Sequence, residues 1–189
     1  MLKEVKKSLE NSPIVKKGEY NYFVNPISDG IPKMEPKMLK ELTNILKKYV
    51  NTDVDKIVAI EAMGIHLATA LSLELDIPFI IIRKREYGLE GEEVINQKTG
   101  YGKSKLYIND LKKGEKIILI DDVVSTGGTL IATLNKLKEI GVELVSTVAV
   151  IEKGEGKKIV EKETGVPIIS IIKIEVINGK VVIESTIED

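Results

Sequence analysis

Short apolar runs alternate with amphipathic segments from about residue 57 to residue 172. Five runs have the length and continuity of buried strands: residues 57–60, 78–82, 117–120, 144–151 and 168–172. Apolar residues recur at helical spacing between them, at 64–75, 129–140 and 157–164. Strands that are apolar on both faces and alternate with helices are typical of a mostly parallel sheet covered by helices. We therefore expect an α/β fold in which the loops after the first four runs meet at one edge of the sheet.

The two ends of the chain predict smaller elements. Residues 1–9 and 37–49 carry apolar side chains at helical spacing, and each segment predicts a helix. Asn178-Gly179 lies between the apolar runs 174–177 and 181–183, which predicts a β-hairpin.

Two segments lack a clear periodicity. Residues 11–36 contain four prolines and are expected to form a loop-rich lobe. Residues 86–104 are polar and glycine-rich, and we expect them to form a long connection before a short strand at 106–108. Connections of that length inside a compact domain are usually functional.

Composition narrows the classes of protein that the chain can represent. The 189 residues fit one domain, 1–189, and 28 Lys and Arg against 29 Asp and Glu give a net charge of -1, which counts against nonspecific nucleic-acid binding. Cysteine is absent and His66 is the single histidine, so thiolate and multi-histidine metal sites are excluded. No apolar run approaches the length of a spanning helix, and residues 1–10 lack a signal-peptide core. We expect a cytoplasmic protein.

The most informative segment is 117–129, IILIDDVVSTGGT. Two carboxylates, Asp121 and Asp122, follow an apolar strand, and a turn of small residues then opens a helix. Backbone amides of such a turn and the helix N-terminus form a phosphate site, and glycine lets the anion approach closely. The carboxylates suit a vicinal diol or a hydrated magnesium ion instead. The pattern therefore matches a ribose 5-phosphate, and the alternative is an ordinary turn whose serine or threonine caps the helix.

This string closely resembles the phosphoribosyl-pyrophosphate (PRPP) motif of the type I phosphoribosyltransferases, and the similarity extends from about residue 22 to the C-terminus. The resemblance implies a mostly parallel sheet flanked by helices, with a small hood contributed by about 11–36 and 153–189. It also implies that Asp121 and Asp122 hold the ribose hydroxyls. The residues that bind the 5-phosphate and its surroundings would be Val123, Ser125, Thr126, Gly127, Gly128 and Thr129. The implied cofactor is Mg²⁺, held mainly by PRPP and at most through water by the aspartates, and the implied assembly is a homodimer.

Two further segments look like the pyrophosphate site of that family. Glu61, Ala62, Met63 and Gly64 are similar to its pyrophosphate loop, which often carries a cis peptide bond that does not precede proline. Arg83 and Lys84 are similar to an Arg-Lys pair that binds pyrophosphate in adenine and xanthine phosphoribosyltransferases, in some cases across a dimer interface. The alternative for this pair is a solvated strand end.

Residues 96–104 match the catalytic loop of the family. Tyr101-Gly102 resembles the Tyr-Gly of the adenine enzymes, but Gly100 stands where those enzymes have a glutamate, which puts a general acid in this loop in doubt. The resemblance implies that Tyr101 and Lys84 act in catalysis with the two aspartates. Three lysines, Lys98, Lys103 and Lys105, either clamp pyrophosphate or are plain solvated side chains.

The base-binding residues favour a 6-oxopurine. Ser125 replaces an aspartate of the familiar hypoxanthine-guanine enzymes and is similar to the adenine branch. Ile151-Glu152-Lys153 and Phe23-Val24-Asn25, however, are similar to the xanthine enzymes, in which the lysine, the phenylalanine segment and the asparagine meet the base. A lysine donor suits an oxo group and suits an exocyclic amine badly.

The combination looks like the archaeal-type hypoxanthine/guanine phosphoribosyltransferases. The reaction that this implies is purine salvage: transfer of 5-phosphoribosyl from PRPP to hypoxanthine or guanine, giving IMP or GMP and pyrophosphate. Adenine and xanthine phosphoribosyltransferases are the alternatives within the family. A PRPP-sensing regulatory protein is the alternative of another class, although the net charge and the irregular N-terminal lobe count against it.

Overall fold

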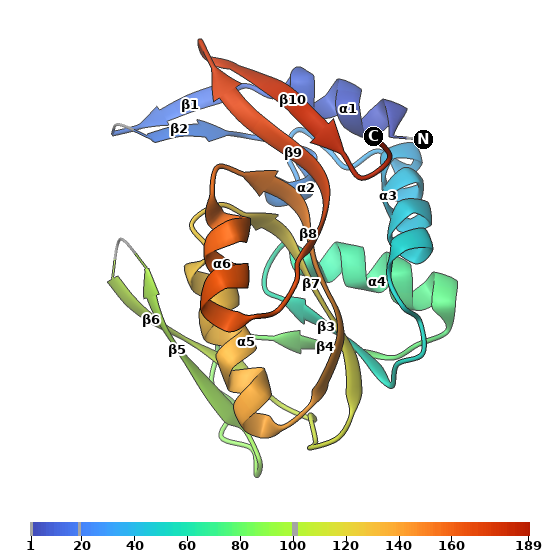
Figure 1. Cartoon of the computed structure of the whole chain (residues 1–189), viewed down its shortest axis with the longest axis vertical. Helices are drawn as coiled ribbons and strands as arrows, with labels where there is room; N and C mark the ends of the chain where they lie inside the picture. The colour runs from blue at the N-terminus through green and yellow to red at the C-terminus, as the bar shows by residue number, and fades with distance from the viewer. Residues whose placement is uncertain (1, 19, 100–101) are drawn as a thin grey trace.

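The computed structural model describes residues 2–18, 20–99 and 102–189 and centres on one twisted sheet (Figure 1). The sheet has six strands in the order β10-β9-β8-β7-β3-β4. Their bounds are β3 Lys56–Ile60, β4 Phe79–Ile82, β7 Lys116–Val124, β8 Glu143–Lys153, β9 Ile169–Ile177 and β10 Lys180–Thr186. β10 runs antiparallel to β9, and the other five strands run parallel to one another. The predicted α/β fold with a mostly parallel sheet is confirmed.

Helices cover both faces of this sheet (Figure 1). On one face lie α3 and α4, whose bounds are Pro36–Tyr49 and Gly64–Leu75, and on the other lie α5 and α6, whose bounds are Gly128–Ile140 and Gly156–Thr164. The packing of β7 explains why residues 117–120 are all apolar. Ile118 and Ile120 belong to the core on the α3–α4 side, whereas Ile117 and Leu119 belong to the core on the α5–α6 side, because successive side chains of a strand point to opposite faces.

The N-terminal lobe is more regular than its prolines predict. After α1 (Lys3–Glu10), strands β1 (Ile14–Lys17) and β2 (Tyr20–Phe23) form an antiparallel hairpin, and α2 (Pro26–Asp29) follows. The expectation of a loop-rich lobe was therefore wrong for these residues. Pairing within a hairpin satisfies the backbone groups of strands that are too short to show a periodicity. The hairpin lies on the same side of the molecule as β9 and β10 (Figure 1).

The polar segment after β4 is also a hairpin rather than a long loop. β5 (Glu93–Thr99) and β6 (Gly102–Ile108) pair in antiparallel register, with Ile95 opposite Leu106. Ile95 and Leu106 are buried in the core beside Leu130 and Leu134 of α5. The predicted short strand at 106–108 is the end of β6, where Leu106, Tyr107 and Ile108 are all buried, whereas polar residues and glycines dominate residues 93–104.

Several strands extend beyond their apolar runs. β7 continues through Asp121 to Val124 because β8 keeps pairing with it, with Asp121 opposite Ala149 and Val124 opposite Glu152. β9 joins two segments that the sequence predicts as separate strands, 168–172 and 174–177. Main-chain pairing with a neighbour holds polar residues in a strand, which a hydrophobic pattern does not indicate.

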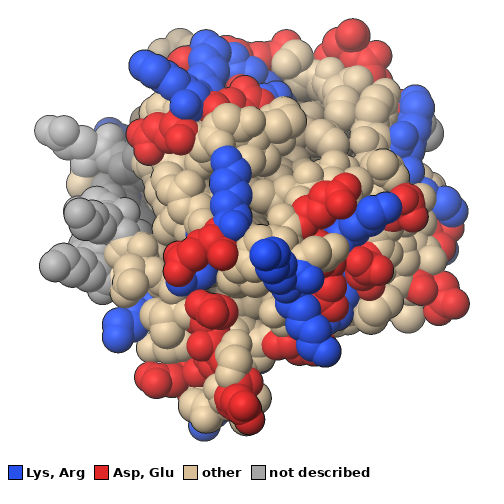
Figure 2. All heavy atoms as spheres, turned by 60° about the horizontal axis from the view of Figure 1, so that its bottom comes forward, with Lys and Arg blue, Asp and Glu red and all other residues tan. Residues whose placement is uncertain are grey.

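The surface carries charges of both signs close together. On the face shown in Figure 2, acidic and basic side chains are interspersed, without a broad area of one sign. Over the ranges that the structure describes, no helix has both the length and the apolar character needed to cross a bilayer.

Candidate active site

The predicted site residues follow four parallel strands at one edge of the sheet. Glu61 follows β3, Arg83 follows β4, the two aspartates lie in the last part of β7, and Lys153 ends β8. Because these strands are mutually parallel, their carboxyl ends share one edge. The prediction that the four loops meet there is confirmed.

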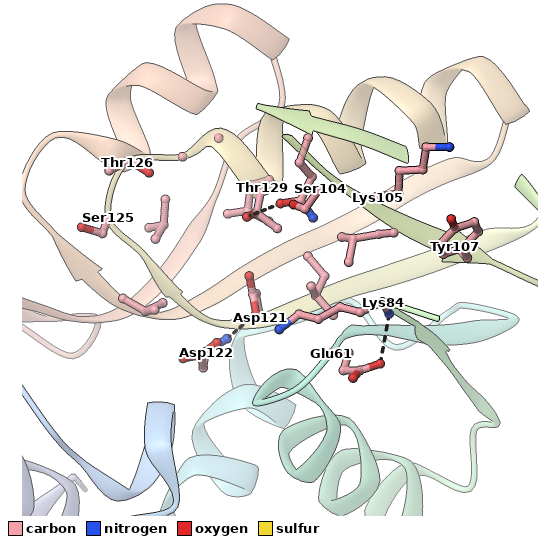
Figure 3. Close-up of a pocket in the computed structure, with 18 residues that line it drawn as sticks. Glu61, Lys84, Ser104, Lys105, Tyr107, Asp121, Asp122, Ser125, Thr126 and Thr129 are labelled. Carbon is pink, nitrogen blue, oxygen red and sulfur yellow. Dashed lines mark hydrogen bonds between the residues drawn. The ribbon is translucent and has the colours of Figure 1, made fainter. Parts of the chain in front are cut away.

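A cavity of about 640 Å³ opens at this edge (Figure 3). Predicted residues that line it are Glu61, Lys84, Lys105, Asp121, Asp122, Val123, Ser125, Thr126, Gly127, Gly128 and Thr129. The wall opposite the turn comes from the β5–β6 hairpin, through Gln97, Ser104, Leu106 and Tyr107. Sequence reasoning missed these four residues. The available signal was a spacing of two residues from Ile95 to Gln97 and from Ser104 to Leu106, which places each polar residue on the same strand face as its apolar neighbour.

The turn after β7 lines the cavity and leads into the first turn of α5. Gly127 is the N-cap of α5, with φ 81°, and as a glycine it has no side chain to bond the first amides of the helix. The first amides of a helix have no partner within the helix, so they face the cavity as an anion site. The alternative in which a serine or threonine caps the helix is therefore wrong. A Cβ at Gly127 would lie 2.6 Å from Val160 Cγ2, so packing as well as φ requires glycine here.

Gly156 supports this turn from the far side and was also missed. A Cβ on Gly156 would lie 2.1 Å from the Ser125 carbonyl oxygen, closer than any side chain can approach. The start of α6 thus packs directly on the backbone of the turn. The sequence offers only a weak signal, a second glycine two residues after Gly154.

Asp121, which is buried, and Asp122, which is half-buried, form a carboxylate pair that lines the cavity. Asp121 is 8% exposed, and its Oδ1 accepts a hydrogen bond of 3.0 Å from the Asp122 amide. Burial, and next the charge of Asp122, raise the pKa of Asp121 well above its ordinary value of 3.8, while Lys84 opposes that rise. The Lys84 side chain points toward Asp121 across the cavity (Figure 3). Burial also raises the pKa of Asp122, although contact with Asp121 opposes it.

Glu61 binds Arg83 and Lys84, the two basic residues that follow β4. Its Oε2 accepts hydrogen bonds from Arg83 Nε at 2.6 Å and from the Lys84 amide at 3.1 Å. Burial opposes ionisation, but these two donors leave the pKa of Glu61 below its ordinary value of 4.5. The Glu61–Ala62 peptide bond is cis, as the resemblance implies. The remaining loop residues, Ala62, Met63 and Gly64, lead directly into α4, and the structure does not place them on the cavity wall.

The three residues expected at the base lie together at the hood, away from the cavity wall. Lys153 is 9% exposed; its Nζ donates to the Asn21 carbonyl at 2.9 Å and lies 5.4 Å from the centroid of the Phe23 ring. Asn25 is fully buried, and its Oδ1 caps α2 by accepting from the amides of Ile27 and Ser28. Asn25 therefore has a structural role in the hood that the sequence did not predict.

Three expected residues have no described side chain. Tyr101 lies outside the described residues, as do the side chains of Lys98 and Lys103. His66, to which the sequence assigns no role, lies in the first turns of α4. Its Nε2 is buried without a hydrogen-bond partner among the described residues, and burial lowers its pKa below 6.5.

An acidic pair beside an open anion turn, at the rim of a parallel sheet, defines a phosphosugar-binding site. Residues 33–181 match the phosphoribosyl transferase domain, and the chain belongs to the phosphoribosyltransferase family. Two archaeal relatives are named hypoxanthine/guanine phosphoribosyltransferase. That of Methanobacterium lacus is 58% identical over 186 residues, 98% of each chain. That of Methanothermobacter thermautotrophicus is 50% identical and covers 97% of this chain and 95% of its own.

Solved structures with the same fold are adenine phosphoribosyltransferases. The protein from Thermoanaerobacter pseudethanolicus has a TM-score of 0.76 at 24% identity, covering 92% of this chain and 99% of its own. The Saccharomyces cerevisiae protein, solved with adenine and an imino-altritol bisphosphate, has a TM-score of 0.73 at 21% identity, covering 89% and 97%. These similarities show the type I phosphoribosyltransferase fold.

Proposed function

We infer that this protein is a purine salvage enzyme that transfers 5-phosphoribosyl from PRPP to hypoxanthine and guanine, releasing pyrophosphate. The single observation that carries phosphoribosyl transfer is the cavity in which Asp121 and Asp122 lie beside the uncapped start of α5. The relatives named for hypoxanthine and guanine, at 50–58% identity over nearly the whole chain, support the choice of base.

In the proposed reaction the carboxylates hold the ribose and the turn holds its phosphate. The 2- and 3-hydroxyls donate to Asp121 and Asp122, and the amides and hydroxyls of the Ser125–Thr129 turn bind the 5-phosphate. As the bond to pyrophosphate breaks, positive charge develops on the ribose. Two fixed carboxylates in a buried site stabilise that charge more than water would. We assign Lys84, which lines the cavity, and Arg83, whose Nε donates to Glu61, to the departing pyrophosphate.

Lys153 and Phe23 fit the proposed purine subsite. Phe23 offers an aromatic face for stacking, and the ammonium group of Lys153 offers donors and no acceptor. A 6-oxo group accepts from such a donor, whereas the exocyclic amine of adenine would leave two donors facing each other. We assign the preference for 6-oxopurines over adenine to this mismatch, and Asn25 to holding the hood in place.

Magnesium fits this site as a partner of the substrate. Across the described residues, no three His, Cys, Asp or Glu side chains gather into a metal site. Carboxylate and phosphate oxygens suit Mg²⁺, so PRPP would hold it, with Asp121 or Asp122 in contact through water. Bound there, the ion would neutralise the charge of the departing pyrophosphate.

The test of the proposed function is release of pyrophosphate from PRPP and Mg²⁺ with hypoxanthine, guanine, xanthine and adenine supplied separately. We expect turnover with hypoxanthine and guanine, and at least a tenfold lower kcat/KM with adenine. A preference for adenine would contradict the role given to Lys153. Binding of PRPP without turnover of any base would instead support a regulatory protein.

We further propose a homodimer that packs through α4 beside the edge strand β4. Leu73 of α4 is 82% exposed, and β4 ends the sheet immediately before Arg83 and Lys84. Burial of such a leucine in an interface stabilises association by roughly 1.5–3 kcal/mol. We expect Leu73→Glu to be monomeric by sedimentation, whereas Ile159→Glu on α6, 41% exposed, stays dimeric. A dimeric Leu73→Glu would place the interface elsewhere.

A further inference from the structure

Gln97 joins the β5–β6 hairpin to the phosphate turn through one hydrogen bond. The Thr129 hydroxyl donates to Gln97 Oε1 at 3.1 Å, and the dashed line from Thr129 in Figure 3 marks this bond. Gln97 is 6% exposed, and both residues line the cavity. A buried carboxamide is costly unless its polar atoms are paired. The hydrogen bond therefore offsets part of the cost of burying the Gln97 carboxamide.

A phosphate in the turn competes with Gln97 for the same proton. Thr129 is the second residue of α5, so its hydroxyl lies beside the amides that face the anion site. The Thr129 hydroxyl has one proton to donate, and the phosphate oxygens beside it act as acceptors. When the phosphate accepts from Thr129, Oε1 of Gln97 loses its donor.

A carboxamide can adapt to this exchange where most side chains cannot. Rotation of its terminal group by half a turn replaces the oxygen with the NH₂ group, and a donor then faces the oxygen of Thr129 or the phosphate itself. Leucine offers neither state. Glutamate accepts in the absence of phosphate but cannot donate when ionised, and its charge would face the phosphate.

We propose that Gln97 is a positioning residue for the 5-phosphate of the substrate: it pairs with Thr129 in both states of the site and ties the hairpin to the occupied turn. The inference rests on the proposed function, because it needs a phosphate in that turn. A second polar contact between the same elements, among the described residues, is Lys136 Nζ to Glu93 Oε2, at 3.4 Å, and neither residue lines the cavity. That pair holds the hairpin on α5 whether or not a phosphate is bound.

The test compares ribose 5-phosphate with pyrophosphate as ligands of the purified protein. Ribose 5-phosphate fills the turn, whereas pyrophosphate fills the subsite near Glu61 and Lys84. We expect Gln97→Glu to raise the Kd for ribose 5-phosphate more than about tenfold and Gln97→Leu to raise it about three- to tenfold. The Kd for pyrophosphate stays unchanged in both variants, and in turnover the KM for PRPP rises while that for hypoxanthine does not.

Glu93→Gln is the matched control, because it weakens the tie outside the cavity. We expect its affinity for ribose 5-phosphate to equal that of the parent protein. Thr129→Val provides a second test through a double-mutant comparison. In a protein that already lacks the Thr129 hydroxyl, Gln97→Leu should weaken ribose 5-phosphate binding less than Gln97→Leu does in the parent protein. This comparison stays informative if Gln97→Glu folds poorly.

Two outcomes would overturn the proposal. In one, Gln97 variants weaken ribose 5-phosphate and pyrophosphate equally, as a loosened hairpin would. In the other, Glu93→Gln reproduces the effect of Gln97→Leu. Either result with normal turnover of the parent protein refutes the role of Gln97 alone, whereas absence of turnover in the parent protein refutes the proposed function.

Discussion

Replacement of Asp121 by asparagine is expected to lower kcat/KM for PRPP by about two to three orders of magnitude. The amide is nearly isosteric with the carboxylate but carries no charge. It therefore keeps one acceptor for a ribose hydroxyl and loses the attraction for the positive charge that develops on the ribose. Steady-state release of pyrophosphate measures the loss, and Asp122→Asn is expected to show a loss of similar size.

Asp76→Asn is the matched control for this substitution. Asp76 is exposed, caps the C-terminus of α4 with φ 57°, and lies outside the cavity; asparagine tolerates that conformation well. Its kcat/KM is expected to equal that of the parent enzyme. Equal activity of Asp121→Asn and the parent would refute the role given to the carboxylate pair.

Asp121→Asn is also expected to make the ligand-free protein more stable at neutral pH. Burial raises the pKa of Asp121 above its ordinary value of 3.8, so between 3.8 and the raised value the native state binds more protons than the unfolded state. Stability therefore falls as pH rises through that window, and the charged form is a cost above it. Urea unfolding of Asp121→Asn across the window should show a weaker dependence on pH; an unchanged dependence would contradict this explanation.

Lys153→Met is expected to lower kcat/KM for hypoxanthine by about ten- to hundredfold, because a hydrogen bond from a charged donor to the 6-oxo group is lost. Methionine keeps an apolar stem of similar length against Phe23, so packing changes little. Activity with adenine is expected to stay level or to rise, since the opposing donor is gone. Initial rates with the two bases, each at saturating PRPP, measure the change in preference.

Two comparisons separate this effect from a structural one. Lys158→Met removes an exposed lysine of α6 and should leave both rates unchanged. Lys153 also donates to the Asn21 carbonyl, so its loss could loosen the hood. A drop that is equal for hypoxanthine and adenine, together with a lower melting temperature, would assign Lys153 to the hood rather than to the base.

The sequence predicted the sheet and the phosphate turn well for one reason. Both are local patterns: an apolar run is buried wherever helices cover it, and Ser125–Thr129 carries its glycines and hydroxyls in consecutive positions. Parallel strands then bring Glu61, Arg83, Asp121 and Lys153 to one edge without further information. These parts of the site could be predicted from order along the chain.

Other parts depended on contacts between distant segments. Residues 93–104 of the β5–β6 hairpin were expected to be a loop, and only 106–108 a strand, because polar residues and glycines dominate the sequence before Leu106. The pairing of β5 with β6 and the packing on α5 decide the rest. Asn25 was expected to contact the base; the fold also uses its Oδ1 to cap α2, which the sequence did not predict. Gly156 carries only a weak local signal, because its requirement is the Ser125 carbonyl, 31 residues earlier in the chain.

By itself, then, the sequence determined the α/β class, the acidic pair, the anion turn and the family, because each is written in consecutive residues or in a regular period. The tertiary structure decided which side chains complete the walls of the site. Gln97 contacts Thr129, which lies 32 residues later in the chain. Lys153 contacts Phe23, so this contact joins the N-terminal and C-terminal parts of the hood. Such contacts depend on how the packed elements lie against one another, and no periodicity in the chain encodes them.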